Sequence, residues 1–545
     1  MTKQIEGSEL APAVSALSAL YEKARHHVRE KVVDGERISS KKLDRHQLAA
    51  HALAYLKTEL EASRQVVAWA ERVGGELEKR IAGAYVGELC RSLRGGVDLG
   101  ACEHIALSEL GIGENDIAET LLSPAVQAIT TTYASGDALV ALAQDARTKG
   151  LGSLGLDETM EAVQGEFRKF VEREVEPIAQ DVHRKDVLIP IELIQKMAEL
   201  GVFGLTIPEE YGGAGFGKVA MCVVTEELSR GYIGVGSLGT RSEIAAELIL
   251  GGGTEEQKRE FLPKLASGEI LPTAVFTEPN HGSDLAHIKS RGEKQADGSF
   301  RIYGQKTWIT HATRADLMTL LVRTIPTDDG YGGLSMFLAK KTRGTEANEF
   351  PDEGLTGTEI KVLGYRGMKE YELSFDGFVV DSNALLGGVE GRGFKQLMTT
   401  FESARIQTAA RGVGVAQAAL DDAMRYAEER IQFGKPIYDF PRVARKIGRM
   451  VARVMAARQL TYFAAREKDE GKRCDLEAGM AKLLATRAAW EAADANVQIH
   501  GGNGYAEEYV ASRLLVDARV LSIFEGANEI QAHVIARRLL EDAGR

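Results

Sequence analysis

Long apolar runs are missing from this sequence of 545 residues, since no stretch reaches the ~18 residues that a membrane-spanning helix needs. The first ten residues, MTKQIEGSEL, also lack the apolar core of a signal peptide. The four cysteines (Cys90, Cys102, Cys222 and Cys474) form no C-x-x-C pair, so they indicate neither a zinc site nor a disulfide framework. We therefore expect a cytoplasmic protein with no membrane partner.

An excess of positive charge is missing as well. The sequence has 67 Lys and Arg residues against 79 Asp and Glu residues, a formal net charge of -12, so we expect no nucleic-acid partner. GGAGFGKV (212–219) has the spacing of a phosphate loop, but Val219 stands where the loop needs Ser or Thr for magnesium. No G-x-G-x-x-G follows a predicted strand and no H-E-x-x-H is present, so we expect neither a dinucleotide fingerprint nor a metal site.

The composition and the apolar periodicity of the sequence change along the chain, and these changes predict a mainly α protein with a central β domain. Residues 1–150 form a helical extension, because stretches such as 43–81 lack proline and repeat Leu and Ala at helical spacing. A glycine-rich linker at 148–155 precedes a second helical segment, 156–272. Short β-branched and aromatic stretches within 273–388 predict a small barrel or sandwich, and 389–545 returns to long helices with apolar stripes, typical of a bundle.

Five short motifs carry the functional signal. They are AVFTEPNHGSD (274–284), YGQKTWIT (303–310), ERIQFGKPI (429–437), VQIHGGNGY (497–505) and LSIFEGANEIQ (521–531). In this order and at these separations they resemble the acyl-CoA dehydrogenase family, over about residues 157–545. The resemblance implies a helical N-domain, a β-barrel middle domain and a C-terminal four-helix bundle. It also implies a flavin oxidoreductase that uses FAD to oxidise the CH–CH bond of an acyl-CoA.

The resemblance assigns the FAD contacts residue by residue. Thr277 would bond the edge of the isoalloxazine ring, Trp308 would form a wall beside the ring, and Thr310 would lie near its reactive N5. By itself Trp308 would be interpreted as a core aromatic residue of a barrel; within GQKTWIT the flavin role is favoured. The complete predicted FAD set is Phe276, Thr277, Ser283, Trp308, Thr310, Arg430, Gln432, Phe433, Gln498, Gly501, Gly502, Ala527 and Glu529. In the family a neighbouring subunit holds the adenine half, so a homodimer or homotetramer is implied.

Glu525 is the predicted catalytic base. It follows an aromatic residue, precedes Gly526, and has apolar flanks, a setting that desolvates a carboxylate and raises its pKa. By the resemblance it removes the α-proton of the acyl group. The alternative is that Glu525 caps the helix expected to begin near Asn528. Some family members place the base just before an arginine that corresponds to Arg405, but Ala404 stands there and cannot act as a base.

The substrate contacts predicted from the sequence are Ser283, Arg241, Glu402, Arg405 and Gly526. In having a helical extension of this size before the family segment, the sequence resembles a member of the family that acts on a short branched acyl-CoA ending in a carboxylate; the resemblance implies (2S)-methylsuccinyl-CoA as substrate, oxidised to mesaconyl-CoA in the ethylmalonyl-CoA pathway. Burying that carboxylate requires a cation. Arg241, among small residues, is the first candidate, with Arg230, Arg366 and Lys369 as others; on the surface Arg241 would pair instead with Glu243 or Glu247.

Three alternatives remain open at the level of sequence. An isovaleryl-type or other short branched-chain dehydrogenase would share everything except the carboxylate-binding cation. A flavin oxidase of the same fold would pass electrons to oxygen, whereas a dehydrogenase would pass them to an electron-transferring flavoprotein. A non-catalytic acyl-CoA-binding protein would lack a competent base, and the presence of Glu525 argues against it.

Overall fold

The computed structural model describes residues 5–101 and 103–541 and divides into two compact units. The first unit combines residues of the N-terminal extension with the C-terminal helices, within 1–162 and 408–545, and the second unit comprises residues 163–407. Two helices, α9 (Glu158–Phe170) and α15 (Gly393–Glu429), cross the boundaries between the units. Among the described residues no helix is both long and apolar enough to cross a bilayer.

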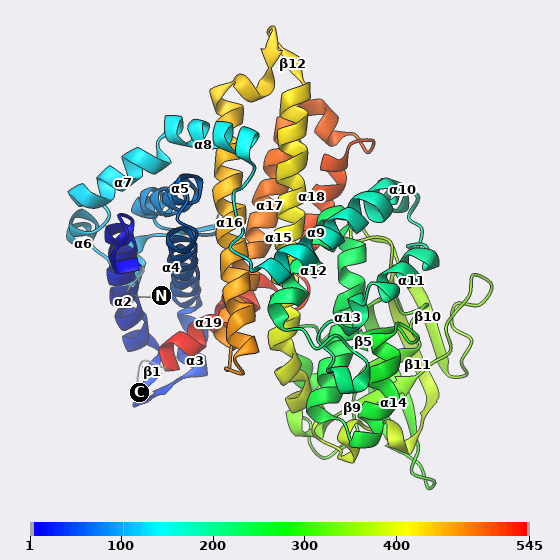
Figure 1. Ribbon diagram of the computed structural model, residues 1–545. Helices are drawn as coiled ribbons and strands as arrows, with labels where there is room; N and C mark the ends of the chain where they lie inside the picture. The colour runs from blue at the N-terminus through cyan, green and yellow to red at the C-terminus, as the bar shows by residue number, and fades with distance from the viewer. Residues whose placement is uncertain (1–4, 102, 542–545) are drawn as a thin grey trace. The chain divides into compact units, whose positions relative to one another are not determined.

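The first unit is almost entirely helical (Figure 1). In the extension the helices are α2 (Ala11–Val32), α3 (Ser40–Arg45), α4 (Gln47–Val73), α5 (Glu76–Ser92), α6 (Glu114–Glu119), α7 (Pro124–Ala134) and α8 (Gly136–Lys149). The C-terminal helices are α16 (Pro441–Asp469), α17 (Asp475–His500), α18 (Val510–Leu521) and α19 (Asn528–Glu541), together with the second half of α15. Three short hairpins complete the unit: β1 (Val33–Asp34) with β2 (Arg37–Ile38), β3 (Val97–Gly100) with β4 (Glu103–Ile105), and β12 (Ile431–Gln432) with β13 (Lys435–Pro436).

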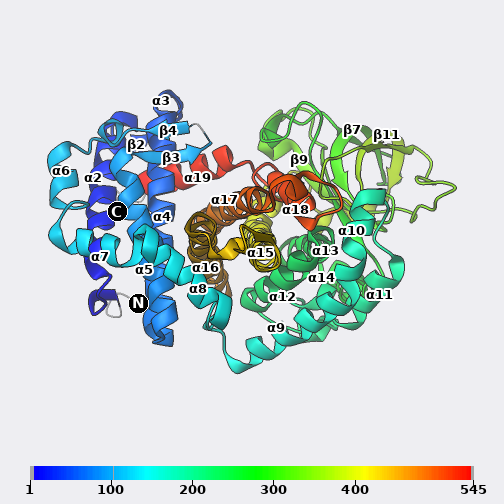
Figure 2. The same ribbon diagram turned by 90° about the horizontal axis from the view of Figure 1, so that it is seen from above.

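Helix α4 is the centre of the extension. Nearly every residue between Ala49 and Ala70 is buried, which is expected of a helix enclosed on all sides. It packs against α2 and α5 of the extension and against α16 and α19 of the C-terminal helices, as the view from above shows (Figure 2). The extension therefore shares one core with the C-terminal helices. The predicted linker is also fixed, because Trp69 Nε1 donates to the Ser153 oxygen and Gln459 Nε2 donates to the Leu154 oxygen.

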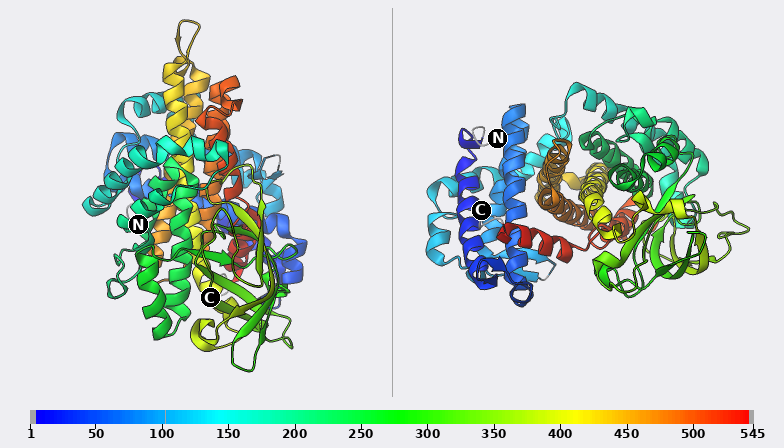
Figure 3. Two further views of the ribbon diagram at one scale, coloured as in Figure 1. Left: turned by 90° about the vertical axis from the view of Figure 1, so that its right-hand side faces the viewer. Right: turned by 90° about the horizontal axis from the view of Figure 1, so that it is seen from below.

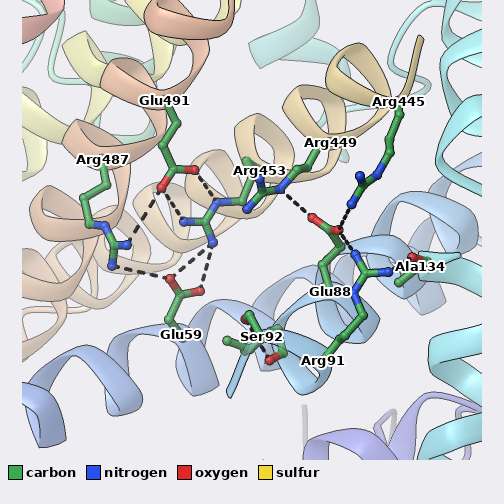
Figure 4. Close-up of polar contacts among 11 residues, drawn as sticks. Glu59, Glu88, Arg91, Ser92, Ala134, Arg445, Arg449, Arg453, Arg487 and Glu491 are labelled. Carbon is green, nitrogen blue, oxygen red and sulfur yellow. Dashed lines mark hydrogen bonds and ion pairs between the residues drawn. The ribbon is translucent and has the colours of Figure 1, made fainter. Parts of the chain in front are cut away.

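A buried ionic network joins the extension to the bundle (Figure 4). Arg453 of α16 forms a two-bond fork with Glu491 of α17, with N–O distances of 3.1 Å, and also reaches Glu59 of α4 at 3.2 Å. Glu59 accepts a further bond from the hydroxyl of Tyr85. Burial would raise the pKa of Glu491, but Arg453 and Arg487 outweigh it and hold the pKa at about 2. The two arginines thus keep Glu491 ionised at the helical interface.

Glu59→Gln is expected to destabilise the first unit by about 3–5 kcal/mol, because it removes one carboxylate from a buried, charged network and leaves the arginines undercompensated. Thermal unfolding should show a clearly lower transition temperature. The matched control is Glu88→Gln, since Glu88 pairs with the more exposed Arg449 and Arg445 in the same view (Figure 4) and should contribute less than ~1 kcal/mol. Equal shifts for both variants would contradict a stabilising role for the network.

The second unit places helices beside a β-sheet. Its helices are α10 (Glu176–Lys185), α11 (Ile191–Glu199), α12 (Lys218–Gly231), α13 (Ile233–Gly252) and α14 (Glu255–Ala266). Its strands are β5 (Pro272–Val275), β6 (Arg291–Lys294), β7 (Phe300–Thr310), β8 (Leu317–Arg323), β9 (Leu334–Lys340), β10 (Leu355–Ile360) and β11 (Glu370–Val380). They pair in the order β10-β11-β7-β6-β8-β5, and β9 pairs with β8. The pairs are antiparallel except β5 with β8 and β6 with β8. The predicted strand segments correspond to β7, β8, β9 and β11.

Candidate active site

The loop that carries Glu525 connects α18 to α19 and is held from two helices. Glu525 adopts a left-handed backbone conformation, with φ of 52°, and Gly526 follows with φ of 86°. A non-glycine residue in this region is strained and persists only where its surroundings fix it. Here Lys482 Nζ of α17 donates to the Gly526 oxygen at 2.5 Å, and Gln531 Nε2 of α19 donates to the same oxygen at 3.1 Å. The chain therefore maintains the direction of the Glu525 side chain at an energetic cost.

The Glu525 carboxylate points to helix α15. Thr408 Oγ1 donates to Glu525 Oε2 at 2.9 Å, and Arg411 Nη2 donates to Glu525 Oε1 at 2.8 Å. These contacts with another helix favour a positioned carboxylate over a cap of α19, which begins at Asn528. The Glu525 side chain is 14% exposed, so it is largely shielded from water while one edge stays accessible. Such a carboxylate can accept a proton from a ligand.

Arg411 is a functional candidate that the sequence analysis did not identify. Its side chain is fully buried, and its guanidinium lies 4.8 Å from the centre of the Phe524 ring. The available signal was a single arginine inside the otherwise small and apolar stretch TAARGVGVA of the bundle helix. A single buried arginine does not by itself predict a function. The functional assignment depends on the contact between Arg411 and Glu525, which only the fold reveals.

The first flavin motif is anchored to strand β7. Lys306 is fully buried and donates to the Phe276 oxygen at 2.9 Å and to Glu278 at 3.1 Å. Thr307 N donates to the Thr277 oxygen at 3.0 Å. The structure therefore brings the TEP segment beside the KTWIT segment, two motifs separated by about 30 residues. It places Thr277 next to the stretch of β7 that carries Trp308, and both lie within the second unit.

Trp308 is not a core aromatic residue. The pairing of β7 with β11 shifts register between Tyr371 and Leu373, so Thr307 and Trp308 together oppose one residue, a β-bulge. Trp308 has φ of 59° and is 57% exposed. A bulge re-aims a side chain, and here it turns a large indole out of the sheet core. An indole so displayed suits a wall for a planar ligand.

Thr310, at the end of the same strand, belongs to a buried polar group. Its Oγ1 donates to Glu370 Oε2 at 3.0 Å, and Glu370 is 5% exposed. Burial raises the pKa of Glu370 to about 7, against the opposing effects of Arg241 and the Thr310 bond. Arg241 Nη2 also lies 3.3 Å from the Tyr365 hydroxyl. The predicted flavin contact Thr310 is thus bonded to Glu370, and the charge of the predicted substrate contact Arg241 acts on the same carboxyl group.

Glu370→Gln is expected to flatten the dependence of stability on pH. The pKa of Glu370 is about 7 in the folded state, and its ordinary value is 4.5. Between these two pH values the folded state holds a proton that the unfolded state has lost, so the free energy of unfolding falls as the pH rises from 4.5 to about 7. Gln removes this loss, which is on the order of 3 kcal/mol. The measurement is thermal unfolding from pH 5 to pH 8, with the exposed neighbour changed in Glu372→Gln as the control. An unchanged slope in Glu370→Gln would contradict the assignment.

The remaining predicted FAD residues lie on exposed or half-exposed backbone. Phe433, with φ of 51°, is 94% exposed at the turn of the β12–β13 hairpin, which extends beyond the ends of α15 and α16 (Figure 3). Gly501 and Gly502 end α17 where an added Cβ would meet no atom within 4 Å. The other exposed members are Ser283, Arg430, Gln432, Gln498 and Glu529, and Phe276, Thr277 and Ala527 are half-buried. An exposed phenyl ring and open glycine backbone fit a cofactor half that is held between subunits.

Three of the predicted substrate residues outside the Glu525 loop belong to helices α13 and α15, and the fourth, Ser283, lies in the exposed loop after β5. Arg405 is buried, its guanidinium 5.8 Å from the Phe401 ring, and Glu402 is half-buried one turn away. Glu243 and Glu247, the alternative surface partners predicted for Arg241, both pair with Lys218. The other candidate cations also have contacts: Arg230 with Glu227, Arg366 with the His183 oxygen, and Lys369 with Glu359.

Family comparisons agree with this geometry. Residues 157–269 match the acyl-CoA dehydrogenase N-terminal domain, residues 273–378 the middle domain, and residues 391–540 the C-terminal domain. The chain belongs to the acyl-CoA dehydrogenase family. The butyryl-CoA dehydrogenase of Megasphaera elsdenii has the same fold, with a TM-score of 0.67 and 33% identity over 71% of this chain and 99% of that chain.

Two further relatives are informative about the extension and the cofactor. The (2S)-methylsuccinyl-CoA dehydrogenase of Cereibacter sphaeroides is 57% identical over 535 residues, 97% of each protein, so the similarity includes the extension. A glutaryl-CoA dehydrogenase of Mycobacterium smegmatis, solved in complex with FADH2, has a TM-score of 0.65 and 26% identity over 70% of this chain and 95% of that chain.

Proposed function

We propose that the protein is an FAD-dependent dehydrogenase that oxidises (2S)-methylsuccinyl-CoA to mesaconyl-CoA. The observation that carries the substrate assignment is the 57% identity to the (2S)-methylsuccinyl-CoA dehydrogenase, since it extends over 97% of both chains, beyond the segment that the family shares. The displayed Trp308 and the shielded Glu525 support the reaction class. The isovaleryl-type alternative would leave this full-length similarity unexplained.

The chain supplies a base and a way to orient it. Glu525 accepts the α-proton of the thioester, and Thr408 and Arg411 hold its carboxylate in one direction. By the family resemblance, the Glu525 backbone N–H donates to the thioester oxygen, which stabilises the negative charge that develops there. The flavin, held by Thr277, Trp308 and Thr310, supplies the acceptor for the hydride that leaves the β-carbon. The product is a trans enoyl-CoA.

The proposed assembly of subunits follows from the exposed β12–β13 hairpin. Phe433 and its neighbours on the β12–β13 hairpin, together with Gly501 and Gly502, would hold the adenine half of FAD of an adjacent subunit in a homodimer or homotetramer. The electron acceptor would be an electron-transferring flavoprotein, and the reaction would take place in the cytoplasm. A protein acceptor suits a flavin from which oxygen is excluded.

The purified protein is expected to be yellow, with roughly one FAD per chain, and to turn over (2S)-methylsuccinyl-CoA faster than isovaleryl-CoA or 2-methylbutyryl-CoA. The assay compares the three thioesters with an electron-transferring flavoprotein as acceptor, and then in air without it. A colourless protein that takes up no added FAD would end the proposal. Rapid peroxide formation without a protein acceptor would favour the oxidase, and preference for isovaleryl-CoA would favour the monocarboxylic alternative.

A further inference from the structure

The Glu525–Arg411 ion pair presents a chemical difficulty for a base. Arg411 Nη2 is 2.8 Å from Glu525 Oε1 and 2.8 Å from Thr408 Oγ1, and the side chain of Arg411 is fully buried. A cation at this distance favours the ionised carboxylate, which keeps it ready to accept a proton but weakens it as a base. A thioester α-proton is weakly acidic, so the reaction would benefit if this cation turned to another anion at the moment of proton transfer.

The proposed substrate contains such an anion at the right distance. In a succinyl-type thioester the free carboxylate is attached to the β-carbon, so its carbon lies two bonds, about 2.5 Å, from the α-carbon. A base in position to attack lies about 3–3.5 Å from the α-carbon. The substrate carboxylate must therefore come within roughly 5–6 Å of the Glu525 carboxylate. Two carboxylates so close, away from water, require a cation between them.

Arg411 is positioned to be the cation between the two carboxylates. Its guanidinium already contacts Glu525, so a substrate carboxylate that lies within roughly 5–6 Å of Glu525 on the side of Arg411 comes within reach of its N–H groups. A guanidinium has five donors in a planar fork and can grip a carboxylate with two parallel bonds. Thr408 can continue to hold the other oxygen of Glu525 while Arg411 turns away.

We propose that Arg411 is a specificity-determining residue that exchanges the Glu525 carboxylate for the free carboxylate of the substrate. Before binding, Arg411 keeps Glu525 ionised. With a dicarboxylic acyl group bound, the guanidinium pairs with the substrate carboxylate, and Glu525 becomes the stronger base when the α-proton must leave. With a monocarboxylic acyl group, Arg411 stays on Glu525 and the base stays weak. The same residue thus binds the correct substrate and slows the reaction of its neutral analogues.

The inference rests on the proposed substrate and is tested with Arg411→Gln and Arg411→Lys, each assayed with methylsuccinyl-CoA and isovaleryl-CoA. We expect Arg411→Gln to lower the ratio of kcat/KM for the two substrates by at least ~30-fold, mainly through methylsuccinyl-CoA. Arg411→Lys keeps the charge but loses the planar fork, so it should lower the ratio by roughly 10-fold. If the glutamine variant does not fold, the lysine variant alone decides the outcome.

The dependence of kcat/KM on pH separates this role from a structural one. In Arg411→Gln the acid limb should move to higher pH with either substrate, because no cation stabilises the ionised Glu525 of the free enzyme. Equal losses on both substrates with an unmoved acid limb would overturn the inference. If the wild-type enzyme fails on methylsuccinyl-CoA yet oxidises isovaleryl-CoA, the proposed function falls and the Arg411 inference falls with it. If the wild-type enzyme prefers methylsuccinyl-CoA and Arg411→Gln keeps that preference, the Arg411 inference alone falls.

Discussion

Glu525→Gln is expected to lower kcat by at least ~10³-fold while the protein keeps its fold and its flavin, since a positioned general base contributes about 10²–10⁴ in rate. Gln preserves the shape of the side chain; its amide oxygen can still accept from Arg411 and its NH2 group can donate to the Thr408 hydroxyl, but it cannot take the α-proton. The backbone of the loop is held independently by Lys482 and Gln531, so the left-handed turn should survive the change. Flavin reduction by substrate in a single turnover measures the effect directly.

Glu402→Gln is the matched control for this prediction. Glu402 is a half-buried carboxylate on α15 and one of the predicted substrate contacts, so the change should mainly raise KM. An inactive Glu402→Gln together with an active Glu525→Gln would assign the base to α15. The control also tests whether loss of any one carboxylate on this part of the chain is enough to stop the reaction.

Arg241→Ala is expected to lower kcat/KM for methylsuccinyl-CoA by at least ~30-fold, because the loss of a charge partner in a pocket costs about 2–5 kcal/mol and 1.4 kcal/mol corresponds to tenfold. Isovaleryl-CoA, which lacks the carboxylate, should lose much less. Steady-state kinetics with both thioesters measures the difference.

An indirect effect through Glu370 is the competing explanation for a loss of activity in Arg241→Ala. Arg241 opposes the rise of the Glu370 pKa, so its removal should raise that pKa further and could disturb Thr310. Arg241→Ala would then slow both substrates by the same factor and change the flavin spectrum, which would contradict a role in carboxylate binding. Combining Arg241→Ala with Glu370→Gln removes this complication, and the selectivity against isovaleryl-CoA should still be lost.

The sequence predicted the parts of the site whose chemistry lies in contiguous motifs. Glu525 stands in a short stretch with an aromatic residue and a glycine, and Trp308 and Thr310 share one strand with a recognisable pattern. The family resemblance and the order of helices and strands were therefore accessible, and the family matches and the structure confirm them. What the pattern could not provide was the β-bulge that exposes Trp308, because it depends on pairing with β11.

Contacts between distant segments were not predictable in the same way. Arg411 and Glu525 are 114 residues apart, so their pairing depends on how α15 packs beside the loop after α18. Arg487 interrupts the apolar stripe of α17, and only the fold shows that it reaches Glu59 of the extension. Lys306 likewise has the composition of a surface residue but is buried against Glu278. A single sequence records each charge but not the partner that makes its burial possible.

The central claim is that Glu525 removes the α-proton of (2S)-methylsuccinyl-CoA while the bound flavin is reduced. The most direct measurement is anaerobic mixing of the wild-type protein with (2S)-methylsuccinyl-CoA, following flavin absorbance and identifying the product after a single turnover. We predict rapid bleaching with one mesaconyl-CoA formed for each flavin reduced, and at least ~10³-fold slower bleaching in Glu525→Gln. Unbleached flavin in the wild-type protein, or equal bleaching rates in the two proteins, would contradict the account.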